Sequence, residues 1–184
     1  GRAWFESVRS LPSLEVDWRR DSQAAESPSA RDRPSLAVGS RHRFAITFEV
    51  GQNGIREGGL IFLSAEPFWA WSEAQATRPN AEGFTTAQPL KSDVELMPLD
   101  LGAAFEVRGR DLLPGERIKF TYGAGDAGAR VDRYAERGAE ILIAVDADGD
   151  GMRGWIKEGP RLDLVARRGS RLVAFGPAEI APNQ

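Results

Sequence analysis

Three alternate aspartates are the residues of this chain whose types and spacing best fit a chemical role: Asp146, Asp148 and Asp150. A hard cation such as Ca²⁺ binds several oxygens that converge from one short loop, and a glycine after the third aspartate permits the sharp turn. Gly151 stands at that place, and Met152 offers its backbone carbonyl one residue later. The run therefore predicts a calcium site with three carboxylate ligands and the Met152 carbonyl.

The run departs from an EF-hand loop beyond this point. Lys157 stands at the twelfth position, where an EF-hand has a bidentate glutamate, and Glu158 comes one place late. No helical pattern flanks the run, so we expect instead a calcium loop between two strands. Asp132, Glu136 or Glu158 would supply a further oxygen ligand.

A polar turn is the alternative interpretation of the same run, because aspartate and glycine are favoured in tight turns. A turn needs only one or two aspartates, however, and three neighbouring carboxylates repel one another unless a cation is bound. Both interpretations stay open from the sequence. A catalytic metal is not favoured, because no histidine or general base lies nearby in the chain.

Histidine and cysteine usage excludes several classes of enzyme. The chain has one histidine, His42, and no cysteine. A catalytic zinc site usually uses two or three histidines, and a Ser-His-Asp triad would have to use His42 itself. His42 lies just before the alternating apolar run from Phe44 to Val50, so we interpret it as a structural residue at the start of a strand. No catalytic or cofactor-binding residue is predicted.

A glycine-rich segment, Gly123–Gly128, matches the G-x-G-x-x-G pattern of dinucleotide-binding proteins. The strand predicted before it, residues 117–122, alternates polar and apolar residues, whereas the first strand of a Rossmann fold is nearly all apolar. Too few residues follow Asp146, which stands near the place of a ribose-binding acid, to complete such a sheet. We favour a loop that joins β elements, and a nucleotide-binding enzyme stays as an alternative.

Two tryptophans, Trp69 and Trp71, are two residues apart and would face the same side of an extended segment. Two such indoles could stack on sugar rings, so a carbohydrate-binding module is a second alternative function. A packed corner is favoured, because a proline and a phenylalanine directly precede them. The other three tryptophans are assigned to the core or to sheet edges: Trp4, Trp18 and Trp155.

The elements that must position these residues are predicted to be β-strands. Residues 41–50 alternate between apolar and polar side chains, which is the period of a half-buried strand. Further short segments of this kind are separated by Gly and Pro turns: 3–8, 14–18, 60–63, 94–97, 104–107, 117–122, 141–145, 155–156, 162–166 and 171–175. Such a series predicts an all-β, sandwich-like single domain of the immunoglobulin or jelly-roll type, with long loops.

The chain has 184 residues, which is enough for one domain with its own core. Residues 1–35 are expected to hold N-terminal strands and a polar linker rich in Ser, Ala, Asp, Arg and Pro. Residues 36–180 are expected to form the β-sandwich domain. Within it, residues 130–137 have the pattern of one short helix, and residues 72–92 look irregular.

Charge and hydropathy limit the partners. The formal net charge is −3, with acids and bases well mixed, which argues against a nucleic-acid surface. No apolar run approaches the roughly 18–20 residues of a membrane helix. We therefore expect neither nucleic acid nor membrane as a partner. The absence of cysteine slightly favours an exported or periplasmic protein, and no oligomeric state is predicted.

Several of these segments together resemble one protein family. The run from Phe120 to Gly125, continuing through 131–137 to the aspartates, is similar to the N-terminal β region of a bacterial family that is defined as a domain of unknown function. The segments Gly54–Gly59 and Trp71–Gln75 add to the resemblance, which covers about residues 38–175. In that family, the β region precedes a larger domain resembling metal enzymes of the PHP or amidohydrolase type.

The resemblance implies that this chain is an accessory domain whose partner is a downstream domain of the same polypeptide. The histidine-rich metal centre of such an enzyme would lie in that downstream domain. No residue here matches the centre, so the resemblance assigns no catalytic residue to this chain.

Overall fold

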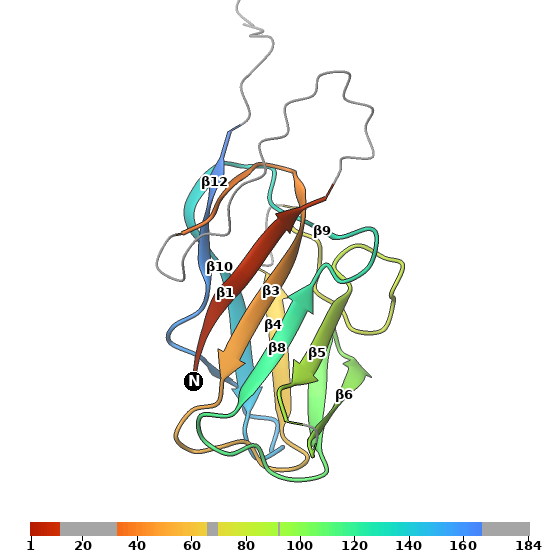
Figure 1. Ribbon diagram of the computed structural model, residues 1–184, viewed down its shortest axis with the longest axis vertical. Helices are drawn as coiled ribbons and strands as arrows, with labels where there is room; N and C mark the ends of the chain where they lie inside the picture. The colour runs from red at the N-terminus through yellow and green to blue at the C-terminus, as the bar shows by residue number, and fades with distance from the viewer. Residues whose placement is uncertain (12–32, 66–69, 92, 167–184) are drawn as a thin grey trace, which may run out of the picture.

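The computed structural model describes residues 1–11, 33–65, 70–91 and 93–166. These ranges contain β-strands and no helix. The strands form two sheets that pack face to face (Figure 1). The prediction of an all-β, sandwich-like fold is therefore confirmed. Within the described residues, no helix long and apolar enough to cross a membrane is found.

The first sheet is antiparallel and lies toward the viewer in Figure 1. Its order is β1 (Arg2–Ser10), β3 (Arg41–Glu49), β8 (Arg117–Tyr122) and β5 (Thr85–Pro89), and the short strand β9 (Ala129–Arg130) pairs with β3. β1 pairs with β3 along its length, from Arg2 opposite Glu49 to Ser10 opposite His42. The N-terminal strand is therefore an edge strand of the sandwich itself.

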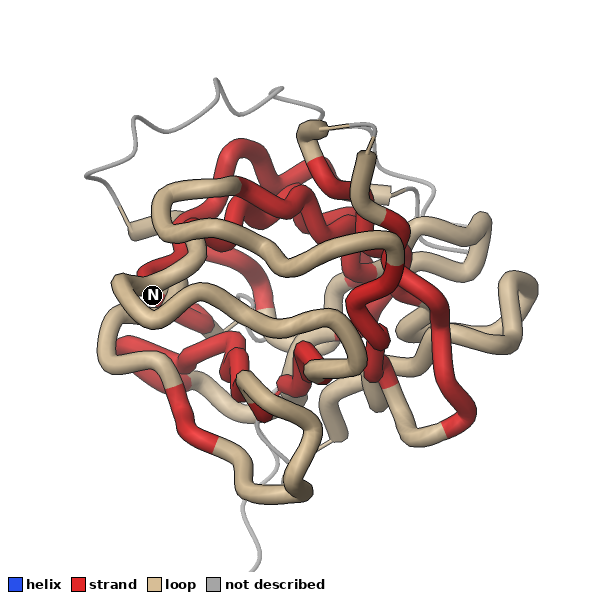
Figure 2. Tube along the Cα trace, turned by 90° about the horizontal axis from the view of Figure 1, so that it is seen from below, coloured by secondary structure: helices blue, strands red, loops and turns tan. Residues whose placement is uncertain are grey.

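The second sheet carries the aspartates at the end of its longest strand. Its order is β2 (Ser35–Ala37), β12 (Arg161–Val165), β10 (Glu136–Asp146), β4 (Leu60–Ala65), β7 (Ala103–Arg108) and β6 (Glu95–Asp100), and β11 (Gly154–Trp155) pairs with β10. The pairing of β12 with β2 is parallel, and the other pairings are antiparallel. Figure 2 looks along the strands onto the loops that cover one end of the sandwich.

The core forms where the alternating residues of the two sheets meet. On β3, Phe44, Ile46 and Phe48 are at most 1% exposed. They stand opposite Tyr122, Phe120 and Ile118 of β8, which are fully buried. Burial of these side chains on one face is what the period of two predicts for a strand with one side toward the core.

The short helix predicted over residues 130–137 does not form. Arg130 ends β9, and Glu136 begins β10. An isolated helix of this length is marginal in water, whereas pairing with β12 buries Ala139 completely opposite Leu162. Tertiary pairing therefore decides the conformation of this segment.

β5 lies in the stretch that looked irregular from the sequence. It is an edge strand, and only Thr85 of its residues is buried. An edge strand with one partner can be polar, and a proline such as Pro89 is tolerated there because no further strand needs its N–H. The predicted strands 14–18 and 171–175 and most of the predicted linker lie outside the described residues.

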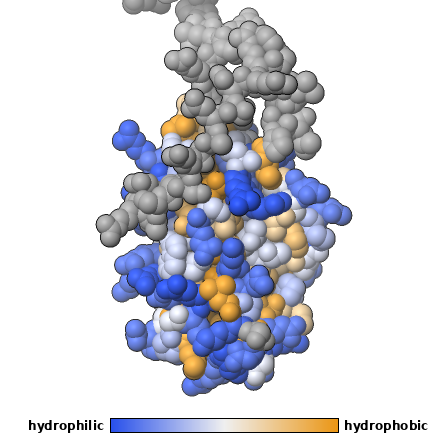
Figure 3. Space-filling model, viewed as in Figure 1, coloured by the Kyte–Doolittle hydropathy of each residue, from blue (hydrophilic) through white to orange (hydrophobic). Residues whose placement is uncertain are grey.

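The outward face of the first sheet is largely hydrophilic, as Figure 3 shows over β1, β3 and β8. Glu49 accepts hydrogen bonds from Arg2 and Arg117 on the two neighbouring strands. The guanidinium groups of the same two arginines lie 5.6 and 5.4 Å from the ring centroid of Trp4. On this face, charged side chains therefore pair with one another, and two arginines flank the Trp4 ring.

Candidate metal centre

The three aspartates lie in the loop of a β-hairpin. β10 ends at Asp146 and β11 begins at Gly154, and Val145 stands opposite Gly154 at the mouth of the loop. The neighbouring loop at this end of the sandwich supports it, because the Arg56 amide donates to the Ala147 carbonyl over 2.8 Å. Two strands and a second loop thus fix both ends of the aspartate run.

Asp146 is 1% exposed and organises the turn with both carboxylate oxygens. Its Oδ1 accepts the Gly149 amide and its Oδ2 accepts the Gly151 amide, each over 2.9 Å. Gly151 has a φ of +90°, a conformation that L side chains rarely adopt. Glycine at this place is therefore required by the turn, as the sequence pattern indicated.

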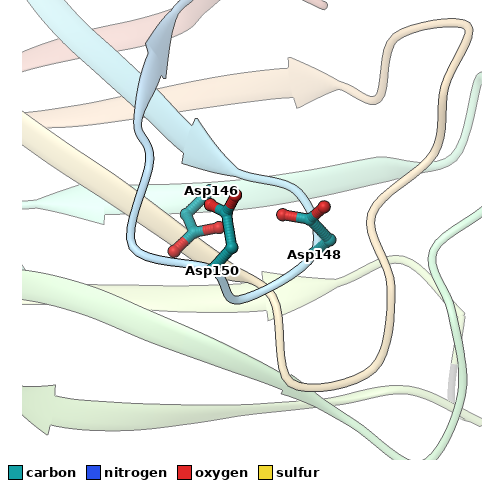
Figure 4. A group of neighbouring side chains, drawn as sticks. All are labelled: Asp146, Asp148 and Asp150. Carbon is teal, nitrogen blue, oxygen red and sulfur yellow. The ribbon is translucent and has the colours of Figure 1, made fainter.

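The loop brings the three carboxylates together. One oxygen from each of Asp146, Asp148 and Asp150 lies within 4.8 Å of the other two. Asp148 and Asp150 are exposed, and the carboxylate of Asp148 points toward the other two side chains (Figure 4). Asp150 Oδ1 also accepts the Met152 amide over 2.8 Å.

No lysine or arginine of the described residues forms an ion pair with these three carboxylates. Elsewhere, some buried carboxylates are neutralised by side chains. Glu116, for example, is paired with both Arg110 and Lys91. The aspartate loop therefore concentrates negative charge that the described part of the chain leaves unpaired.

The donor set fits a hard cation. Each carboxylate oxygen has two lone pairs, so Asp146 can accept its amide hydrogen bonds and still bind an ion. Oxygen ligands from one short loop suit Ca²⁺ better than a transition metal, which prefers nitrogen or sulfur. The Met152 side chain is 76% exposed, and a ligand role for its backbone carbonyl stays a prediction.

Two of the residues suggested as further ligands are too distant. Glu136 begins β10 and Asp146 ends it, and an eleven-residue strand separates its ends by on the order of 30 Å. Asp132 precedes β10 at that far end, where its carbonyl accepts the Gly39 amide. Glu158, the third candidate, is not part of the carboxylate cluster either.

His42 is buried at the start of β3. The Ser40 hydroxyl donates to the Ala37 carbonyl and so accepts a hydrogen bond from His42 Nε2 over 2.6 Å. His42 Nδ1 is then the acceptor that faces the Ser10 hydroxyl at 3.4 Å. Burial lowers the pKa of His42 to about 4, so the ring is neutral at pH 7. These contacts fit the structural role expected from the sequence.

The glycine-rich segment joins β8 to β9, so no helix follows it to bind a phosphate. Close packing accounts for its glycines. A Cβ on Gly125 would lie 2.1 Å from the Pro79 carbonyl oxygen, and one on Gly123 would lie 2.6 Å from the His42 carbonyl oxygen. The Arg43 side chain donates to the carbonyls of both glycines.

The described tryptophans lie in the core or at sheet edges. Trp69 lies outside the described residues. Trp71 is half-buried and packs against the main core. Trp155 is 62% exposed on the short strand β11, which pairs only with β10 in the described sheet and so lies at a sheet edge, one of the two places expected.

Comparisons with known proteins do not assign the chain to a family. No model of a protein family matches the chain, and no curated protein is similar to it.

Proposed function

We propose that this chain is a non-catalytic accessory β domain in which one Ca²⁺ ion stabilises the β10–β11 hairpin. The convergence of three unpaired carboxylates in one loop carries the calcium part of the proposal. Asp146, Asp148 and Asp150 would supply side-chain oxygens, and Met152 a carbonyl. The ion would relieve the repulsion between the carboxylates and hold the loop in one conformation.

The proposed role as an accessory domain is supported by the composition of the described interior. Large apolar side chains from both sheets fill it. The single histidine is enclosed between Ser10 and Ser40 and is neutral, which suits a structural side chain. The neighbouring domain, a metal-dependent hydrolase of the same polypeptide, is proposed from the family resemblance alone.

Calcium should raise the thermal stability of this protein. After removal of metal with EDTA, an excess of Ca²⁺ about 100-fold above its Kd should stabilise the fold by about 2.7 kcal/mol. For a chain of this size, that corresponds to a rise in Tm of about 5–10 °C. The measurement is thermal unfolding followed by circular dichroism. A sample with Mg²⁺ in place of Ca²⁺ is the control. Mg²⁺ should have little effect, because it needs a more regular octahedral site.

The Asp148→Ala variant tests the site directly. Asp148 makes no hydrogen bond or ion pair with the described residues, so its loss should leave the Tm in EDTA nearly unchanged. The calcium-dependent rise should disappear in this variant and persist in Asp126→Ala, which removes an exposed aspartate from another loop. An equal Tm of the wild type with Ca²⁺ and with EDTA would make the run a plain turn.

A further inference from the structure

A row of apolar side chains crosses the outward face of the second sheet. Ile61 and Leu63 of β4 face the core, so Phe62 between them faces outward. Strand register aligns five outward residues on five strands: Leu99, Ala104, Phe62, Ala144 and Trp155. Phe62, Ala104 and Ala144 form a small cluster of their own, separate from the main core. The row runs across the strands and ends at the exposed Trp155.

A hollow of about 460 Å³ lies over part of this row. Phe62 and Ala144 line it together with Trp155, and residues 71–74 and the β6–β7 turn lie at its other side. This volume is within the range of small-molecule binding sites, roughly 300–1,000 Å³. The second sheet therefore presents a concave surface, whereas the outward face of the first sheet is covered by paired charges.

Two large apolar side chains at this hollow are open to solvent. Trp155 is 62% exposed, and Leu101 is 60% exposed. Trp4 on the other sheet is also directed outward, but two arginines flank its ring. An uncovered indole at the edge of a hollow offers an apolar face to a ligand.

Polar groups with unused hydrogen-bonding capacity line the same hollow. The Arg153 guanidinium lies 3.8 Å from the centroid of the Phe62 ring, which holds it in place, and no carboxylate of the described residues pairs with it. Glu73, which also lines the hollow, has no ion pair or side-chain hydrogen bond with the described residues. The buried Nε1 of Trp71 has no hydrogen-bond partner among the described residues. This Nε1 has almost no exposed surface, so a ligand in the hollow does not contact it.

We propose that this hollow binds a short saccharide, with Trp155 as the stacking platform. A sugar ring presents an apolar C–H face to an indole and hydroxyl groups around its rim. Each hydroxyl both donates and accepts, so one ring can accept from Arg153 and donate to Glu73. This mixture of one uncovered indole with donors and an acceptor fits a polyol better than a purely apolar partner. Arg153 and Trp155 belong to the same β10–β11 hairpin as the aspartate loop.

Isothermal titration calorimetry of the full chain, once with Ca²⁺ and once in EDTA, tests the proposal. The probes are cellohexaose, xylohexaose and mannohexaose as neutral sugars, hexagalacturonate as an acidic one, and a proline decapeptide. We expect at least one hexasaccharide to bind, and the Trp155→Ala variant to bind it at least tenfold more weakly. A preference for hexagalacturonate would identify an acidic sugar paired with Arg153. Trp155→Phe should retain most of the affinity, because it keeps an aromatic face.

Trp4→Ala is the matched control, since it removes a tryptophan from the opposite sheet, and it should bind the sugar as the wild type does. Arg153→Ala provides a second test that keeps every tryptophan, and it should also weaken binding. The proposal is overturned if no hexasaccharide binds the wild type, if Trp155→Ala and Arg153→Ala both bind it unchanged, or if only the proline peptide binds. None of these results changes the calcium prediction, which is measured without sugar.

Discussion

At the scale of single residues, two buried carboxylates are stabilised in different ways. Glu116 accepts two hydrogen bonds from the Arg110 guanidinium, and these contacts lower its pKa to about 2. Asp146 instead accepts the backbone amides of Gly149 and Gly151. The first arrangement neutralises a charge with a neighbouring cation, whereas the second leaves a full negative charge in the loop. The proposed calcium ion would supply the positive charge that the second arrangement lacks.

His42 should make the protein less stable as the pH falls from about 6.5 to about 4. The unfolded state binds a proton with a pKa near 6.5, whereas burial lowers the pKa of the folded state to about 4. The contribution of neutral His42 is therefore complete above this range and is lost within it. Between pH 7 and pH 5 the loss in free energy of unfolding should be on the order of 2 kcal/mol. Urea unfolding at the two pH values measures it.

The His42→Asn variant isolates this effect. It should be less stable than the wild type at pH 7, because it loses ring contacts with Phe44. Its stability should change much less between pH 7 and pH 5, since no other histidine titrates there. An equal pH dependence in the variant and the wild type would show that His42 is not the titrating group.

At the scale of elements, connections between strands are fixed by close backbone contacts. The β8–β9 connection passes the 72–84 loop so closely that the Gly83 amide donates to the Gly128 carbonyl over 2.8 Å. Gly125 approaches Pro79 of that loop. In the same way, the Arg56 amide holds the aspartate loop. The sandwich therefore positions its loops by packing them on one another.

The Gly125→Ala variant should lose about 1–3 kcal/mol of unfolding free energy, because its Cβ would collide with the Pro79 carbonyl 2.1 Å away. Gly154→Ala is a matched control. Neither glycine has a positive φ, and the nearest atom to a Cβ on Gly154 is 3.9 Å away. Urea unfolding should give Gly154→Ala a stability close to that of the wild type. A loss of the same size in both variants would mean that crowding at Pro79 is not the cause.

At the scale of the whole molecule, the two sheets are joined by apolar contacts across the interior. Phe120 of β8 in the first sheet and Phe105 of β7 in the second have ring centroids 5.8 Å apart. Their outward faces differ, since one carries paired charges and the other carries the hollow beside Trp155. The core therefore makes one folding unit with two chemically distinct surfaces.

Phe120→Ala should remove about 3–5 kcal/mol from the free energy of unfolding, because a large cavity would open between the sheets. Lys119→Ala, on the outward side of the same strand, should cost less than about 1 kcal/mol, because its ion pair with Glu6 is solvent-exposed. Urea unfolding followed by circular dichroism and by tryptophan fluorescence measures both variants. Separate transitions for the two signals would contradict a single cooperative core.

The sequence by itself determined the all-β class and most of the central strands. The alternation in residues 41–50 and 117–122 is strong because one face of each strand is fully buried, and the structure places β3 and β8 there. The edge strand β5 and the first part of β10 were not predicted. Few or none of their residues need to be apolar, since pairing with a neighbouring strand forms them.

For the candidate sites, sequence spacing alone brought out the aspartate run, because all of its carboxylates come from one short loop. Only the tertiary structure decided that Asp132 and Glu136 are far from it, since a strand of eleven residues lies between. The hollow beside Trp155 was likewise absent from any local pattern. Its residues come from several strands and from the connections between them. Cross-strand register aligns Phe62, Ala144 and Trp155, and the folded connections bring residues 71–74, the β6–β7 turn and Arg153 to them.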